Sequence, residues 1–297
     1  MPDQATRDAI ASLPCWPGPI DIAPLSGGIT NRNFKVTTAG HERFVVRIGR
    51  DIPEHGVMRF NELAAARAAH AAGLSPEVVY AGDGLLVSRF IDGRTFTPAD
   101  VRAVENLGRI VELMRRCHTE VPRFFQGPAL IFWVFQVIRN YLQLLEAQQV
   151  NPLGVALAGL AAQAQRLERA LGPVSIVFGH NDLLAANLLD DGTRLWLIDW
   201  DYAGFNSPLF DLANLATNNE LPPELETFVL EAYFGAAPGV DARRGFAAMQ
   251  CASLLRETLW GAVSRLTSNI DFNYDAYAHD YLNRFERRWR AFEAEHG

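Results

Sequence analysis

The chain has 297 residues, of which 49% are hydrophobic, and it carries a formal net charge of −7. This length allows one large domain or two lobes, and no apolar run approaches the roughly 20 residues of a membrane span or the core of a secretion signal, so we expect a cytoplasmic protein without a membrane partner. Acidic and basic residues are mixed without a basic stripe, which argues against a nucleic acid partner.

The first part of the chain is predicted to form strands around a glycine-containing turn. Short β-prone runs cover residues 34–37 and 44–48, and residues 25–33 (LSGGITNRN) form a turn that joins an earlier run to the first of these. Residues 58–72 are alanine-rich with helical periodicity, and glycine and proline stop signals follow. Residues 84–91 (GLLVSRFI) are a further apolar run that favours a strand.

From Pro98 onward the pattern is mostly helical, with a group of short strands in the middle. We therefore expect an α+β, two-lobe fold, in which residues 1–92 form a small β-rich lobe and residues 93–297 a larger, mainly helical lobe. A ligand site is expected in the cleft between them. The predicted helices cover 99–118, 131–148, 154–171, 209–217, 224–233, 242–267 and 274–293, and the predicted strands cover 174–178, 187–189 and 195–198.

Polar residues gather around these short strands. The run HND (180–182) is followed by Asn187, five residues after its aspartate, and by Asp199 at the end of the LWLID run. The catalytic loop of protein kinases has the same order of an aspartate, an asparagine five residues later and a metal-binding aspartate on the next strand. A carboxylate orients a hydroxyl nucleophile and takes its proton, and Mg²⁺ prefers oxygen ligands. A hairpin between Asn187 and Asp199 would bring two such ligands together.

The N-terminal part supplies groups suited to a nucleotide. Arg47 lies on a predicted strand and Glu62 on the helix that follows, and kinases use such a pair to hold the α- and β-phosphates of ATP. Backbone N–H groups and hydroxyls of the glycine-containing turn are suited to cover the phosphates. The candidates in this turn are Ser26, Gly27, Gly28, Thr30 and Asn31.

These motifs together resemble the choline/ethanolamine kinase family, within the aminoglycoside phosphotransferase and choline kinase superfamily. The similarity covers roughly residues 25–285, and its most specific parts are HNDLLAAN, IDWDYAG, FDLAN and LWGAVSRLTSNIDFNYDAY. The resemblance implies a protein-kinase-like fold and the use of ATP and Mg²⁺. Choline kinases have an arginine where protein kinases have a lysine, and Arg47 agrees with this.

The resemblance also implies roles for individual residues. Asp182 would be the catalytic base, and Asn187 and Asp199 would bind Mg²⁺. Asp211, in the FDLAN motif, would brace the catalytic loop, and His180 is expected to be a structural residue of that loop. The adenine would be contacted by the backbone of Arg89 and Ile91.

The acceptor pocket is predicted from aromatic residues, because ring faces bind a quaternary ammonium that has no hydrogen-bond donor. Tyr202, Trp260, Phe272 and Tyr277 stand where the family encloses its cationic substrate, and we expect them to line one pocket beside the catalytic aspartate. Glu257 is expected at the edge of this pocket.

The chain departs from the family at two places. Glu257 stands where the family commonly has a second tryptophan, and Asn218, with Glu220 nearby, stands where the family has a glutamate. A carboxylate attracts a quaternary ammonium but also hydrogen-bonds a primary one, so the choice between choline and ethanolamine stays open.

The sequence thus predicts an ATP-dependent kinase of a small cationic alcohol. A kinase of another small alcohol or of an aminoglycoside is the nearest alternative, although no acidic cluster broad enough for a polycationic antibiotic is evident. A catalytically silent nucleotide-binding scaffold is the alternative from a different class. The oligomeric state is left open.

Overall fold

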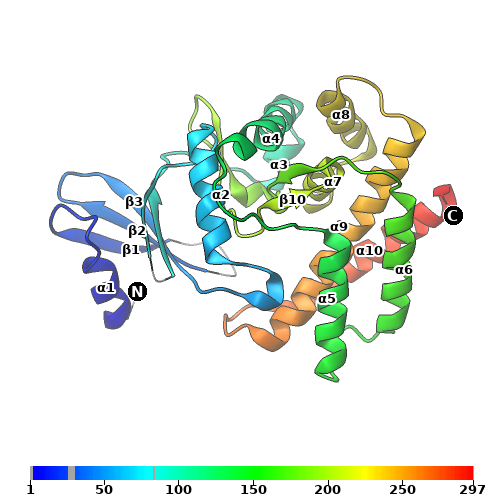
Figure 1. Ribbon diagram of the computed structural model, residues 1–297, viewed down its shortest axis with the longest axis horizontal. Helices are drawn as coiled ribbons and strands as arrows, with labels where there is room; N and C mark the ends of the chain where they lie inside the picture. The colour runs from blue at the N-terminus through cyan, green and yellow to red at the C-terminus, as the bar shows by residue number, and fades with distance from the viewer. Residues whose placement is uncertain (1–2, 26–30, 83, 297) are drawn as a thin grey trace.

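The computed structural model describes residues 3–25, 31–82 and 84–296, and it has a β-rich and a mainly helical part (Figure 1). The β-rich part is a five-stranded antiparallel sheet with the order β1-β2-β3-β5-β4. Alternate residues of β2 and β3 are buried, as in a sheet with one face in a core. Its strands are β1 (Ile20–Leu25), β2 (Arg32–Thr38), β3 (Arg43–Ile48), β4 (Val78–Gly82) and β5 (Leu85–Arg89).

Helix α1 (Gln4–Ala11) supplies the cover for this sheet. Ile10 and Leu13 join Phe34, Val46 and other strand residues in a small core of their own. Asp3 caps the helix by accepting a hydrogen bond from the Thr6 amide. The sequence analysis did not predict this helix.

Helix α2 (Arg59–Ala71) lies between the sheet and the helical part (Figure 1). A short 3₁₀ turn, η1 (Pro53–His55), precedes it. Its buried alanines, among them Ala65 and Ala69, belong to the large core of the helical part, and α2 packs against α4. Small side chains allow this close approach, so the helix that carries Glu62 is anchored in the larger core.

The helical part is built around α9 (Val240–Thr267), where nearly every residue from Gly245 to Ser264 is buried. Helices α5, α6, α7 and α10 pack against α9, which is therefore enclosed by other helices along most of its length. The other helices are α3 (Pro98–Arg102), α4 (Val104–Phe124), α5 (Val134–Ala147), α6 (Leu157–Ala170), α7 (Pro208–Asn218), α8 (Pro223–Phe234) and α10 (Tyr274–His296). No helix among the described residues is long and apolar enough to cross a membrane.

Five short strands complete the helical part in two small sheets. The strands β6, β8 and β9 form one sheet, and β7 pairs with β10 in the other. Both sheets are antiparallel. These strands are β6 (Arg94–Thr95), β7 (Val177–Gly179), β8 (Leu188–Asp190), β9 (Leu195–Leu197) and β10 (Gly204–Asn206).

The α+β arrangement agrees with the sequence prediction, and most elements lie near their predicted bounds. The prediction of one helix over residues 99–118 is wrong, because the backbone is extended at Ala103 and separates α3 from α4. A capping box at Thr97 and Asp100 stabilises α3 as a separate turn. The strands β4, β6 and β10 were also missed, since each is short and is defined by its partner in the sheet.

Candidate active site

The loop that follows β7 is held by the side chain of Asn181. Its backbone is left-handed, with φ of 65°, a conformation that asparagine tolerates better than most residues. The side-chain nitrogen Nδ2 of Asn181 donates to the carbonyl oxygens of Tyr202, at 3.0 Å, and Gly204, at 3.1 Å. These bonds fasten residues 180–184 to the segment that follows β9.

Asp211, in the first turn of α7, holds the same loop from the other side. Its carboxylate accepts hydrogen bonds from the backbone N–H of His180, at 2.9 Å, and of Asn181, at 2.7 Å. His118 Nε2 lies 2.9 Å from the same carboxylate. Burial by itself raises the pKa of Asp211, but the contacts with His118 and His180 together outweigh burial and lower it. The bracing contacts expected of Asp211 are present.

His180 itself is buried within this frame. Its Nε2 lies 2.9 Å from the carbonyl oxygen of Ile198, and its ring packs edge-on against Trp200. Burial lowers the pKa of His180 and favours the neutral ring. These contacts agree with the structural role expected of it.

Asp182 lies at the tip of the loop, half-buried, with Asn187 beside it. The Asn187 amide nitrogen donates to the Asp182 carbonyl oxygen at 2.9 Å and lies 3.4 Å from its carboxylate. Burial raises the pKa of Asp182 to about 7, with the charge of Arg256 opposing and that of Glu257 adding to the increase. A carboxylate with a pKa near neutrality is suited to accept a proton from a hydroxyl.

Asn187 and Asp199 meet at the open end of the β8–β9 hairpin. The N–H of Ile198 donates to the Asn187 carbonyl oxygen at 3.0 Å, which places the residue before Asp199 against Asn187. Asp199 has a left-handed backbone with φ of 68°, a feature that clusters at functional sites. Desolvation by the surrounding protein, and then the charges of Asp201, Asp182 and Glu62, raise the pKa of Asp199. The side chain is accessible to solvent, so the neighbouring carboxylates act on it directly.

Arg47 on β3 and Glu62 on α2 form the predicted ion pair, and both side chains are buried. The Arg47 Nε and Nη1 atoms are also buried, and neither has a hydrogen-bond partner among the described residues. Buried donors without acceptors are costly. The two free donors of this guanidinium therefore fit oxygen atoms of an anion such as a phosphate group.

Arg59 connects this pair to the catalytic part of the site. Its Nη1 lies 2.7 Å from Glu62 Oε2 and 2.6 Å from Asp201 Oδ1, and its Nη2 donates to Asn31 Oδ1 at 2.9 Å. Asn31 in turn donates to Asp201 Oδ2 at 2.9 Å. The sequence analysis gave no role to Arg59 or Asp201, because nothing in their local pattern shows that they meet.

The structure describes only some of the residues predicted to contact the nucleotide. Of the glycine-containing turn, Asn31 lies in the described chain, whereas Ser26, Gly27, Gly28 and Thr30 lie outside it. The N–H of Arg89 donates to the carbonyl oxygen of Glu77 at 2.9 Å, so it is used within the sheet. A contact from Arg89 to adenine would need another backbone atom, and Ile91 lies in the segment that joins β5 to β6.

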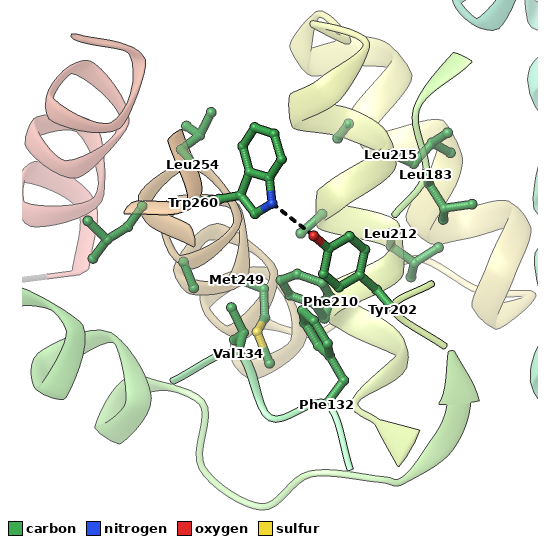
Figure 2. Close-up of a cluster of buried hydrophobic side chains, with 14 of the residues drawn as sticks. Phe132, Val134, Leu183, Tyr202, Phe210, Leu212, Leu215, Met249, Leu254 and Trp260 are labelled. Carbon is green, nitrogen blue, oxygen red and sulfur yellow. Dashed lines mark hydrogen bonds between the residues drawn. The ribbon is translucent and has the colours of Figure 1, made fainter. Parts of the chain in front are cut away.

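The predicted aromatic residues of the acceptor pocket are neighbours. Trp260 on α9 points toward Tyr202, and its Nε1–H donates to the Tyr202 hydroxyl at 2.8 Å (Figure 2). The ring centroids of Trp260 and Tyr277 are 5.4 Å apart, and those of Tyr277 and Phe272 are 5.8 Å apart. Phe272 is 38% exposed, whereas Trp260 is 5% exposed. The four side chains thus form one continuous aromatic wall.

His55 supports this wall from behind. Its two ring nitrogens each lie 3.0 Å from a hydroxyl oxygen, Nδ1 from Tyr141 and Nε2 from Ser264. Its ring centroid is 5.5 Å from that of Trp260. Burial lowers the pKa of His55 to about 3, so the ring is neutral and fixes Trp260 without adding charge.

Glu257 was predicted to lie at the edge of the pocket, but it is buried. Its Oε1 pairs with Nη1 of Arg256, and its Oε2 accepts a hydrogen bond from the Tyr277 hydroxyl at 2.7 Å. Arg256 is fully buried too, and its Nη1 lies 3.8 Å from Asp182 Oδ1. The sequence analysis missed Arg256, although a charged pair inside the apolar run of α9 is an unusual feature.

Comparisons with known proteins show which family the chain belongs to. The sequence profile described as "Phosphotransferase enzyme family" matches residues 21–246. LicA of Haemophilus influenzae is 30% identical over 211 residues, which cover 70% of this chain and 61% of LicA, so the chain matches about three fifths of that relative. Probable choline kinase 1 of Arabidopsis thaliana is 26% identical, with 91% of this chain and 86% of the relative covered.

The fold has solved counterparts. A crystal structure of a choline/ethanolamine kinase family protein from Mesorhizobium loti superposes with a TM-score of 0.76, at 28% identity, over 97% of this chain and 98% of that one. The family resemblance and the fold class predicted from the sequence are therefore confirmed.

The brace around the loop is open to a stability test. Asp211→Asn places an amide where a carboxylate accepts two backbone N–H groups, so we expect the free energy of unfolding to fall by about 2–4 kcal/mol in urea titrations. Asp275→Asn is the matched control, because Asp275 pairs with Arg265 at the surface and its loss should cost less than about 1 kcal/mol. Equal stability of the two variants would contradict the bracing role.

Proposed function

Since the chain belongs to the phosphotransferase enzyme family, we propose that it transfers the γ-phosphoryl group of ATP to the hydroxyl of a small cationic alcohol, choline or ethanolamine first. One observation carries the proposal: Asp182 stands at the tip of a braced loop, in contact with Asn187, and the aromatic wall lies close by, connected through Arg256. A proton acceptor beside rings that fit a cationic head suits phosphorylation of an amino alcohol.

The nucleotide is expected on the other side of the site. Arg47 offers two buried donors without partners among the described residues, which suits the α- and β-phosphates. Glu62 keeps that guanidinium in place, and Arg59 links Glu62 to Asp201. These contacts would orient the triphosphate toward Asp182, because they join the sheet to the segment that follows β9.

The donor atoms at the end of the β8–β9 hairpin fit Mg²⁺. Asn187 offers an amide oxygen and Asp199 a carboxylate, and both are hard ligands. No cluster of three His, Cys, Asp or Glu side chains with metal-binding geometry occurs in the described part of the chain, so phosphate oxygens would complete the shell. Bound Mg²⁺ neutralises phosphate charge during phosphoryl transfer.

The chain's own residues account for the remaining chemistry. The acceptor hydroxyl oxygen forms a bond to the γ-phosphorus, the bond from that phosphorus to the β–γ bridging oxygen breaks, and ADP leaves. The hydroxyl proton passes to the Asp182 carboxylate. Catalysis is then mainly positioning, and the bonds from Asn181 and Asp211 fix the loop that positions Asp182.

The proposal is tested by ADP release from the purified protein with ATP, Mg²⁺ and a panel of alcohols. We expect turnover with at least one small amino alcohol and the matching phosphomonoester in the ³¹P NMR spectrum. ADP release with an aminoglycoside alone would move the protein to another substrate class. ATP binding without turnover on any alcohol would favour a silent nucleotide-binding protein and overturn the proposal.

Asp182→Asn tests the assigned base. The amide keeps the shape of the side chain but cannot take a proton, so we expect kcat to fall by about 10²–10⁴-fold while the Kd for ATP stays within a few-fold. Asp190→Asn is the control, since Asp190 pairs with Arg109 at the far end of the hairpin. A kcat within a few-fold of the parent would exclude Asp182 as the base.

Asp199→Ala tests the metal site. Removal of the carboxylate ligand should abolish activity at ordinary Mg²⁺ concentrations, whereas circular dichroism should report an unchanged fold, because the side chain is accessible. Titration with Mg²⁺ provides a second readout, in which the half-saturating concentration rises steeply. A folded variant with normal Mg²⁺ dependence would show that Asp199 is not a ligand.

A further inference from the structure

Arg256 is a buried cation that lies against the Tyr202 ring of the aromatic wall. It lies on the central helix α9, and its guanidinium carbon is 4.2 Å from the centroid of the Tyr202 ring and 5.7 Å from that of Phe132. Figure 2 shows these two rings below Trp260. The side chain is 2% exposed, although arginine is among the residues least often buried without a compensating role.

The two edges of this guanidinium differ. Nη1 faces the negative groups, Glu257 Oε1 and, at 3.8 Å, Asp182 Oδ1. Nε and Nη2 are buried without a hydrogen-bond partner in residues 3–25, 31–82 and 84–296. The N–H bonds of Nε and Nη2 run parallel on one edge, and this fork matches the two oxygens of a carboxylate.

Stability does not explain the pair that Arg256 makes with Glu257. Burying two ions carries a large desolvation cost, and replacing such a pair by apolar residues is often neutral or stabilising. The two unpartnered donors of Arg256 add a further cost. A ligand that accepts from this edge would offset that cost.

The same residue changes what the aromatic wall can bind. Arg256 is stacked over Tyr202, so a positive charge already occupies one ring that would otherwise receive a cationic head. Both Glu257 oxygens are already engaged, by Arg256 and Tyr277. The rings of Tyr277 and Phe272 and the carboxylate of Asp182 are left for a cationic group. Arg256 and Asp182 therefore offer a cation and an anion side by side, which complements a zwitterion better than a simple cation.

We propose that the acceptor is a small alcohol that carries a carboxylate as well as an amino group, with the carboxylate bound to the Nε and Nη2 edge of Arg256. This inference rests on the proposed function and narrows its substrate class. The transfer is unchanged: the acceptor hydroxyl gains the γ-phosphoryl group of ATP, its proton passes to Asp182, and ADP leaves. Arg256 is then a specificity-determining residue.

Matched substrate pairs test the inference. Serine is ethanolamine with a carboxylate on the amino-bearing carbon, and homoserine is related to aminopropanol in the same way. We expect kcat/KM, measured by ADP release and confirmed by ³¹P NMR of the product, to be about 10- to 100-fold higher for at least one hydroxy amino acid than for its decarboxylated counterpart. Choline should be a poorer substrate than that acid.

Variants assign the preference to the guanidinium edge. Arg256→Lys keeps the charge but loses the parallel N–H pair, so the ratio of kcat/KM between acid and counterpart should fall about tenfold. Arg256→Met combined with Glu257→Gln removes both charges of the buried pair together and should bring the ratio close to one. Thermal unfolding verifies that each variant is folded. If the double variant is not folded, the lysine variant and the parent's substrate pairs still decide.

The possible outcomes separate the two proposals. Turnover of ethanolamine or choline with no gain from a carboxylate overturns this inference and leaves the proposed function in place. If the hydroxy amino acids remain the better substrates, by the same ratio of kcat/KM, in both variants, the role of Arg256 is overturned. Absence of turnover on every compound overturns both proposals.

Discussion

Crowding of negative charge is the constraint on which this site depends. Asp199 is surrounded closely enough by Asp201, Asp182 and Glu62 for their charges to raise its pKa. Neighbouring like charges repel one another unless cations offset them. Arginines from three separate elements offset the repulsion: Arg47 from β3, Arg59 from α2 and Arg256 from α9. The site is therefore assembled only when the sheet, α2 and α9 are all in place.

Hydrogen bonds around the loop after β7 provide the frame that these charges need. Asn181 ties the loop to the segment after β9, and Asp211 accepts from two backbone N–H groups of the same loop. Most buried polar groups of this frame have a partner, although Nδ1 of His180 has none among the described residues, so the loop is held at modest cost. Arg47 and Arg256 each keep two buried donors without a partner among the described residues. These donors are guanidinium N–H groups, which suit the anionic ligand groups proposed for the site.

Sequence reasoning found the local part of the site and missed the long-range part. Asp182, Asn187 and Asp199 are set by short spacings within one loop and hairpin, so their proximity follows from local structure. Arg59 meets Asp201 across 142 positions, and no periodicity reports such a contact. Arg256 had a visible signal, a charged pair within an apolar helix, but its position beside Asp182 depends on how α9 packs against α7. For the same reason, Glu257 was expected at an edge and is in fact buried.

The position of α2 explains how the nucleotide side and the acceptor side are joined. Although α2 follows β3 in the chain, its alanines are packed into the large core, so Glu62 and Arg59 move with the helical part. Arg47 and Asn31 belong to the sheet side and reach across to these residues and to Asp201. Any displacement of the sheet must stretch these ion pairs and hydrogen bonds together, because they share Arg59 and Glu62. Arg59 and Glu62, in the first turn of α2, therefore couple the position of the sheet to the carboxylates around Asp182.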